Sequence, residues 1–107
     1  MKIISWNVQG AKKMQVVQEV KFLIRTHKAD MLFLLETMVN DSNIKKILPL
    51  LGFEHYDYVS PVNHSGGIAV LWNSDNIHAL VLMKESRAIH MLILDPSKAQ
   101  NSVISGV

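Results

Sequence analysis

The sequence contains no cysteine among its 107 residues, which excludes disulfide bonds and thiolate metal sites. It also has little net charge: 11 basic and 9 acidic residues leave a formal charge of +2, so charge alone gives no argument for a nucleic-acid partner. No apolar run approaches the roughly 18 residues of a membrane-spanning helix, and the N-terminus lacks the pattern of a signal peptide. We therefore expect an intracellular protein without a membrane partner.

Apolar residues, in contrast, are abundant and make up 49% of the chain. This composition is typical of a folded globular protein and argues against disorder. The length suits one domain, which we predict to span residues 1–107, and no internal repeat or low-complexity segment divides it.

Two near-continuous apolar runs, at residues 2–8 and 31–35, predict strands that are buried on both faces of a parallel sheet. Between them, residues 12–28 change to the period of a helix. The side chains expected on the buried stripe of this helix are Val16, Val20, Leu23, Ile24 and His27. Strand, helix and strand at this spacing predict a right-handed βαβ unit with parallel pairing.

A second, shorter helix is expected after the segment Asn40-Asp41-Ser42, which offers N-cap residues. Gly52 is a natural stop for this helix, and Pro49 should kink or tighten its last turn.

Further strands are predicted over 53–59, 68–72, 77–83 and 88–94, and from Ser102 onward. The polar connectors at 73–76 and 84–87 are short, as antiparallel hairpins require. His78 and His90 lie in neighbouring predicted strands, so we expect them to be cross-strand partners. The whole pattern predicts an α/β (α+β) fold in which βαβα is followed by an antiparallel meander, in one mixed sheet.

Asn7 and Glu36 are the candidate functional pair, since each follows or ends one of the two parallel strands. Ligands bind at this carboxyl edge in open α/β sheets. A carboxylate and an amide oxygen suit Mg²⁺, which can polarise a phosphoryl oxygen and activate water. Two ligands alone do not make a catalyst, because in-line attack on a phosphodiester also needs a base and donors. Polar residues that merely cap strand ends remain an equal alternative.

The turn Ser65-Gly66-Gly67 would allow a backbone to approach a phosphate closely, although an ordinary glycine turn before a strand is favoured on local pattern. Lys12 and Lys13 could contact a phosphate backbone or simply begin a solvated helix. His64 is the one histidine whose polar, glycine-bearing loop suggests a function.

Three segments together resemble the endonuclease/exonuclease/phosphatase superfamily, and within it the apurinic-type endonuclease domains of plant non-LTR retrotransposons. They run from Lys2 to Gly10, from Ala29 to Thr37 and from Ser65 to Trp72. Their specific elements are Trp-Asn-Val-x-Gly and Leu-x-Glu-Thr, in order and at the family's separation. The likeness extends over the whole chain and corresponds to about the first half of a family domain.

The resemblance implies a four-layer α/β-β/α sandwich that cleaves phosphodiester or phosphate-ester bonds with Mg²⁺ or Mn²⁺, with DNA as its partner. The expected location is intracellular and, for a protein that acts on DNA, nuclear. The resemblance also implies that Asn7 positions the scissile phosphate and that Glu36 ligates the metal. The residues expected along the DNA backbone are Gln9, Gly10, Lys12, Lys13, Ser65, Gly66 and Gly67.

The family's later elements are absent: the sequence has no Gly-Asp or Asp-His dipeptide, and no Tyr follows Ser102. We therefore expect an inactive N-terminal half of a retrotransposon-derived endonuclease. Its second sheet should be missing, which would expose an apolar face formed by 68–72, 77–83 and 88–94 and favour self-association.

Three alternatives remain open. The chain could be a partial record of an intact, active endonuclease, or a non-catalytic dimerising or partner-binding module. A nucleotide-binding α/β domain is disfavoured, because no glycine-rich phosphate loop follows the first strand.

Overall fold

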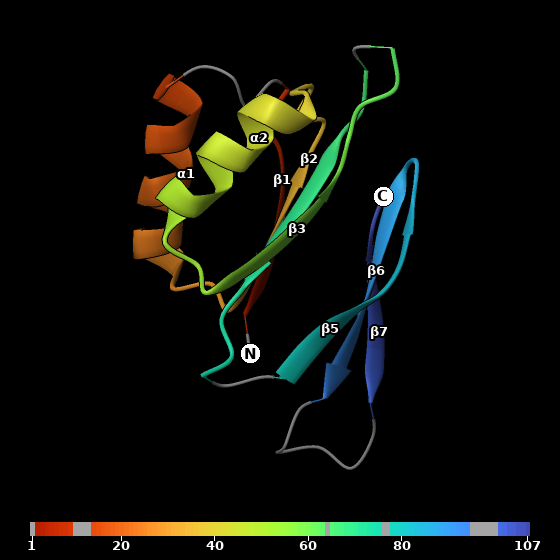
Figure 1. Cartoon of the computed structure of the whole chain (residues 1–107). Helices are drawn as coiled ribbons and strands as arrows, with labels where there is room; N and C mark the ends of the chain where they lie inside the picture. The colour runs from red at the N-terminus through yellow and green to blue at the C-terminus, as the bar shows by residue number, and fades with distance from the viewer. Residues whose placement is uncertain (1, 10–13, 64, 76–77, 95–100) are drawn as a thin grey trace.

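The computed structural model describes residues 2–9, 14–63, 65–75, 78–94 and 101–107. The chain folds into three layers, in which two helices, a first sheet and a second sheet are stacked (Figure 1). In chain order the elements are β1 (Ile3–Asn7), α1 (Met14–His27), β2 (Met31–Leu35), α2 (Asp41–Ile47), the 3₁₀ helix η1 (Leu48–Leu51), β3 (His55–Val59), β4 (Ile68–Trp72), β5 (His78–Glu85), β6 (Ala88–Leu94) and β7 (Ser102–Gly106).

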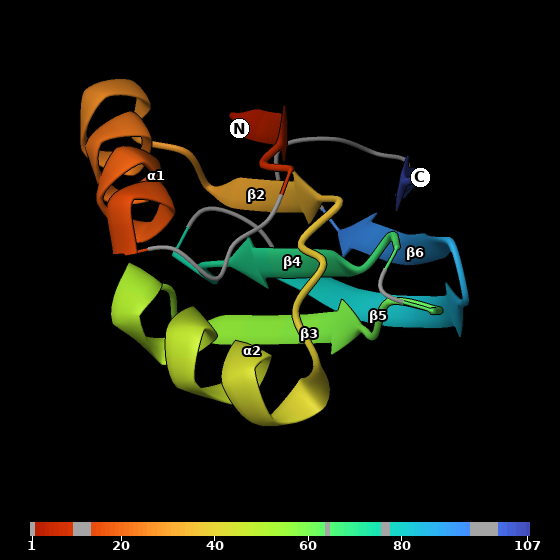
Figure 2. The same cartoon turned by 90° about the horizontal axis from the view of Figure 1, so that it is seen from above.

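The first sheet has the strand order β1-β2-β4-β3. Figure 2 shows β2, β4 and β3 side by side in this order. β1 and β2 are parallel, which confirms the predicted βαβ unit, and the register places Asn7 opposite Leu35. β4 then pairs antiparallel with both β2 and β3. The two central strands are covered on both faces, which explains why β2 and β4 are apolar at every position.

One face of the first sheet is covered by α1, α2 and η1. Val20 of α1 and Leu48 of η1 pack with Leu32 and Leu71 of the sheet in one buried cluster. The predicted helical stripe is wrong at its last member, since His27 is exposed, and the side chain of Val16 lies outside the described residues. Among the described helices, none is long and apolar enough to cross a membrane.

The boundaries of the second helix follow from its capping residues, as the sequence predicts. Asn40 is the N-cap, and its Oδ1 accepts a hydrogen bond from the backbone N–H of Asn43 at 3.1 Å. The last turn tightens into the 3₁₀ helix that contains Pro49. Gly52 ends it in the left-handed conformation, with a φ of 80°.

The prediction of one mixed sheet is wrong, because β5, β6 and β7 form a separate antiparallel sheet. The connector 84–87 is a hairpin as expected, whereas the connector after β4 carries the chain from the first sheet to the second. The physical reason lies in the burial pattern. Along β6 buried residues alternate with half-buried ones from Ile89 onward, so this strand offers one apolar face for stacking on another sheet.

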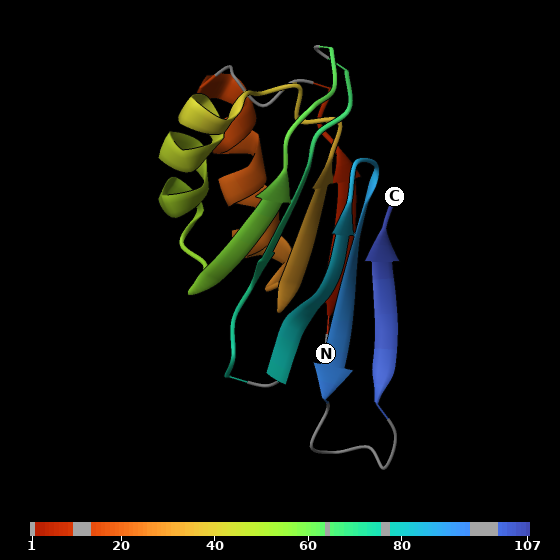
Figure 3. The same ribbon diagram turned by 45° about the vertical axis from the view of Figure 1, so that its right-hand side comes forward.

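The expectation that the second sheet is missing is also wrong. Ile89, Met91 and Ile93 of β6 pack against the inner face of the first sheet, where they join Phe33 and Val70 in a second buried cluster. The two sheets lie face to face along their length (Figure 3). The face that the sequence predicts to be in water is therefore the inner core of the molecule.

The outer face of the second sheet carries the exposed apolar side chains instead. Leu80, Leu82, Met83 and Val103 are 47–57% exposed. The apolar content of strands 78–94 thus splits between a buried inner face and an exposed outer one.

The two strand histidines are not cross-strand partners, since His78 pairs with Leu94 and His90 with Met83. The register is set by the hairpin turn between β5 and β6 and by a shift between Val81 and Met83, which chain spacing does not reveal. His90 instead has Nε2 at 2.7 Å from Glu85 and Nδ1 at 2.6 Å from Ser105.

Candidate functional site

A cavity of about 370 Å³ lies at the ends of β1 and β2, beside the loop that precedes β4. We call it the strand-end cavity. Its lining residues are Asn7, Leu35, Glu36, Val62, Ser65, Gly66, Gly67, Ile68, Ser86, Arg87 and Val107. The structure thus brings together five of the residues that the sequence singled out. Gln9 does not line the cavity, and Gly10, Lys12, Lys13 and His64 lie outside the described residues.

Asn7 reaches this cavity because the parallel register places it beside Leu35, which is the residue before Glu36 in the chain. Both side chains are exposed. The Oδ1 of Asn7 accepts a hydrogen bond from the backbone N–H of Gln9 at 3.2 Å, which closes an Asx-type turn. Capping of the strand end is therefore one of its roles. Its side-chain NH₂ is a donor at the edge of the cavity.

Glu36 stands on an unusual backbone. Its φ is 54°, and that of Met38 is 55°, in the left-handed region that costs a non-glycine residue on the order of 1 kcal/mol. Two hydrogen bonds hold this segment: the N–H of Thr37 donates to the Gly67 carbonyl at 3.1 Å, and that of Met38 to the Gly66 carbonyl at 2.9 Å. The glycine turn therefore holds the backbone segment that directly follows Glu36.

Gly67 is required here for a reason that the sequence did not show. Its φ is +87°, and a Cβ atom at this position would collide with the hydroxyl of Thr37, which is 2% exposed. The packing of Thr37 on Gly67 supports the ordinary-turn interpretation of this glycine. Ser65 and Gly66 remain exposed at the cavity.

Arg87 and Ser86 are lining residues that the sequence interpretation missed. They occupy the turn between β5 and β6, and stacking of the second sheet on the first carries this turn to the end of β2. The only local signal was a basic residue in a polar connector. An exposed guanidinium can bind a phosphate with two parallel hydrogen bonds, which gives the cavity a group suited to an anion.

Of the lining residues that the structure describes, Glu36 has the one acidic side chain and Arg87 the one basic side chain. No cluster of three or more His, Cys, Asp or Glu occurs in the part of the chain that the structure describes. Mg²⁺, however, is commonly held by one or two carboxylates together with water and substrate phosphate. Glu36 with the neighbouring Asn7 fits this sparse mode and would bind the ion weakly.

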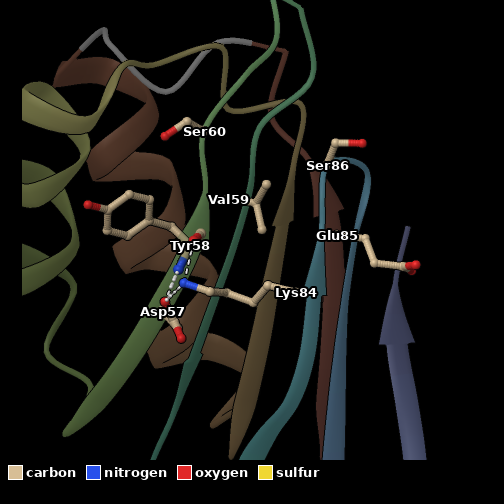
Figure 4. Close-up of a pocket in the computed structure, with 7 residues that line it drawn as sticks. All are labelled: Asp57, Tyr58, Val59, Ser60, Lys84, Glu85 and Ser86. Carbon is tan, nitrogen blue, oxygen red and sulfur yellow. Dashed lines mark hydrogen bonds and ion pairs between the residues drawn. The ribbon is translucent and has the colours of Figure 1, made fainter.

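A second cavity, of about 470 Å³, lies between β3 and β5 (Figure 4). Its lysine is occupied, since the Nζ of Lys84 is 2.9 Å from Asp57 and donates to the Tyr58 carbonyl at 3.4 Å. The pair links the two sheets. We therefore assign the candidate chemistry to the strand-end cavity, which also contains the predicted pair.

Two stacked sheets with a helical layer outside, and a polar cavity at the strand ends, define the class of α/β sandwich proteins. Residues 4–95 match the model of the Endonuclease/Exonuclease/phosphatase family. This match covers most of the chain, and the chain therefore belongs to that family. Its members are nuclease- and phosphatase-type hydrolases that generally depend on a divalent metal.

Solved structures agree with the fold. The AP endonuclease LMAP from Leishmania major is similar with a TM-score of 0.62 and 20% identity, over 96% of this chain and 38% of that one. The human Nocturnin catalytic domain with bound sulfate is similar with a TM-score of 0.50 and 18% identity, over 94% of this chain and 46% of that one. The chain thus spans less than half the length of either structure. None of the curated protein sequences matches it.

Proposed function

We propose that this chain is the N-terminal half of a Mg²⁺-dependent endonuclease that hydrolyses phosphodiester bonds in DNA. The observation that carries the proposal is the strand-end cavity, in which Glu36, Asn7 and Arg87 line one space. The family to which the chain belongs supports hydrolysis of a phosphate ester. The similarity to an AP endonuclease supports DNA as the substrate and, with it, a nuclear location.

Each polar residue of the cavity has a distinct role in this proposal. Glu36 holds the metal ion, which when bound would polarise a phosphoryl oxygen and stabilise the developing charge. The side-chain NH₂ of Asn7 donates to an oxygen of the scissile phosphate and orients it. Arg87 binds a neighbouring phosphate through its planar fork of donors. The exposed Ser65-Gly66 turn lies along the DNA backbone.

The 107-residue chain alone should not turn over substrate. In-line attack on a phosphodiester requires a base for the water, and Glu36 is the one acidic side chain among the described residues that line the strand-end cavity. The short share of the similar structures that this chain spans, 38% and 46%, supports a truncated domain. The Trp6–Gly10 and Leu34–Thr37 elements support an origin in a plant non-LTR retrotransposon. In a longer form of the protein, later residues would supply the missing groups.

The first experiment measures phosphate and metal binding without requiring turnover. We expect the purified chain to bind a short DNA duplex weakly and more tightly with Mg²⁺ than with EDTA, as measured by fluorescence anisotropy. Arg87→Ala should weaken binding about tenfold or more, since hydrogen bonds to a charged group contribute about 1.5–3 kcal/mol. Arg25→Ala is the matched control, because Arg25 is an exposed arginine at the end of α1, outside the cavity.

The role of Glu36 is tested with Mn²⁺, whose free form is measured by electron paramagnetic resonance. Glu36→Gln should abolish Mn²⁺ binding and the Mg²⁺-dependent part of DNA binding, whereas Glu54→Gln should change neither. Equal binding by all variants would overturn the assignment of the cavity. Metal-dependent nicking of a supercoiled plasmid that Glu36→Gln abolishes would instead show that this half-domain is catalytic.

A further inference from the structure

A hairpin turn of the second sheet reaches the strand-end cavity. It consists of Ser86 and Arg87, since Glu85 and Ala88 form the last pair of the β5–β6 ladder. Ser86 lines the strand-end cavity together with Arg87, and it also lines the second cavity, between β3 and β5, together with Lys84. The contacts that hold this turn on the first sheet therefore determine where Arg87 lies.

Lys84 faces the first sheet because of an irregularity in β5. In a regular strand side chains alternate, so a residue three places after Val81, which packs against the inner core, would face outward. The ladder of β5 and β6 shifts register between Val81 and Met83, which reverses this alternation. Lys84 consequently lies opposite Ile89, which is fully buried between the sheets. Residues directly opposite one another share a face of the sheet, so Lys84 faces inward.

Asp57 of β3 faces Lys84 from the first sheet. It lies opposite Val70 of β4, which belongs to the same inner core, so its side chain is on the face toward the second sheet. The Nζ of Lys84 is 2.9 Å from the Oδ1 of Asp57 and donates a hydrogen bond to the Tyr58 carbonyl at 3.4 Å (Figure 4). These contacts join β3 to the end of β5, next to the turn.

Arg87 depends on its backbone for its place. Its side chain is exposed and forms no ion pair with a described residue, so the guanidinium is available to an anion. A turn of two residues connects it closely to the paired ends of β5 and β6. A hairpin held at Lys84 keeps the guanidinium at the strand-end cavity, whereas an unanchored hairpin end can move away from the first sheet.

We propose that Lys84 is a positioning residue for Arg87. Its ion pair with Asp57 holds the hairpin turn against β3, so that the guanidinium lines the strand-end cavity and binds a phosphate of the substrate. The role rests on the proposed function, in which Arg87 makes this phosphate contact. β-bulges that redirect a side chain recur beside functional sites, and the register shift after Val81 redirects Lys84 in this way.

A direct contact between Lys84 and DNA is less compatible with the structure. The Nζ is already engaged by Asp57 and by the Tyr58 carbonyl. The described residues that line its cavity include two carboxylates, those of Asp57 and Glu85, which would repel a phosphate. The two roles predict opposite effects of removing the Asp57 charge. Loss of a positioning contact weakens DNA binding, whereas a lysine that binds DNA directly would be released and would strengthen it.

The test measures binding of a short DNA duplex with Mg²⁺ at fixed ionic strength, by fluorescence anisotropy. We expect Lys84→Met to weaken binding about two- to fivefold, because a partly exposed ion pair biases an equilibrium by no more than about fivefold. Asp57→Asn should also weaken it, although this variant removes a negative charge and keeps an acceptor for the Tyr58 N–H. Lys45→Met is the control for a lost positive charge and should leave binding unchanged, since Lys45 is exposed on α2, outside both cavities.

Double variants test whether the effect depends on Arg87. In an Arg87→Ala background, Lys84→Met and Asp57→Asn should have no further effect on DNA binding, since both act through the guanidinium. Binding of Mn²⁺ at Glu36 should be the same in all of these variants, and circular dichroism verifies their fold.

The possible failures are distinguishable. Tighter DNA binding by Asp57→Asn, unchanged binding by Lys84→Met, or a Lys84→Met loss that persists in the Arg87→Ala background overturns the positioning role, while the phosphate contact of Arg87 stands. Unchanged binding by Arg87→Ala overturns the phosphate contact and the positioning role together.

Discussion

The two sheets of this molecule differ in how many of their faces are covered. The first sheet is enclosed between helices and the second sheet, and its central strands β2 and β4 are apolar along their length. Among the described residues, the second sheet is covered on one face, and its strands place exposed residues such as Leu80 and Val103 on the other. The comparison shows that a continuous apolar run does not by itself indicate an enclosed strand, because residues 79–83 of β5 are all apolar although Leu80 and Leu82 are exposed.

The largest expected effect comes from truncating the same residue type in the two sheets. Leu71 of β4 is fully buried, so Leu71→Ala should lower the free energy of unfolding by about 2–5 kcal/mol through lost burial and a cavity. Leu80→Ala in β5 should cost less than about 1 kcal/mol, because this leucine is 47% exposed. Urea unfolding followed by circular dichroism measures both values. Equal losses would mean that the outer face of the second sheet is covered in solution.

An intermediate effect is expected where Gly106 of the second sheet lies against Phe33 of the first. A Cβ atom on Gly106 of β7 would overlap the ring of Phe33 in β2, so Gly106→Ala should cost about 1–3 kcal/mol by forcing the sheets apart. Val103→Ala is the control in the same strand, since Val103 points to the exposed face and should change stability little. Urea unfolding followed by circular dichroism measures the change in stability of both variants. An unchanged stability for Gly106→Ala would contradict close stacking of β7 on the first sheet.

The smallest expected effect is that of the ion pair between β5 and β3. Lys84 and Asp57 are 2.9 Å apart but 45% and 31% exposed, so Lys84→Met should cost no more than about 1 kcal/mol. The lysine is the better residue to replace, because Asp57 also accepts a hydrogen bond from the backbone N–H of Tyr58. The loss should shrink as salt is raised. A larger, salt-independent loss would show that packing of the lysine stem connects the sheets.

Much of the first sheet could be predicted from the sequence, because its signals are local. The parallel βαβ unit follows from two apolar runs and a helical period between them, and strand 31–35 has the predicted bounds. The second helix could be delimited because Asn40 and Gly52 act through hydrogen bonds and backbone angles within a few residues. The division into two sheets could not be predicted, since a polar connector at 73–76 serves a hairpin and a crossing between sheets equally well.

The residues of the candidate site also fall into those that the sequence places together and those that only the structure brings together. Asn7 and Glu36 could be placed together from the parallel strands alone, because their register follows from the βαβ unit. The position of Gly67 against Thr37 depends on a turn some thirty residues further along the chain. Arg87 lies in another sheet, so no spacing in the sequence connects it with Glu36.

The sequence by itself determined the strands, the helices, their capping residues and the polar ends of β1 and β2, because backbone propensity and the period of apolar residues act locally. Only the tertiary structure decided which strands belong to which sheet, which apolar face is buried and which hairpin turn reaches the cavity. These outcomes depend on face-to-face stacking, whose free energy comes from side chains far apart in the chain, such as Phe33 and Met91.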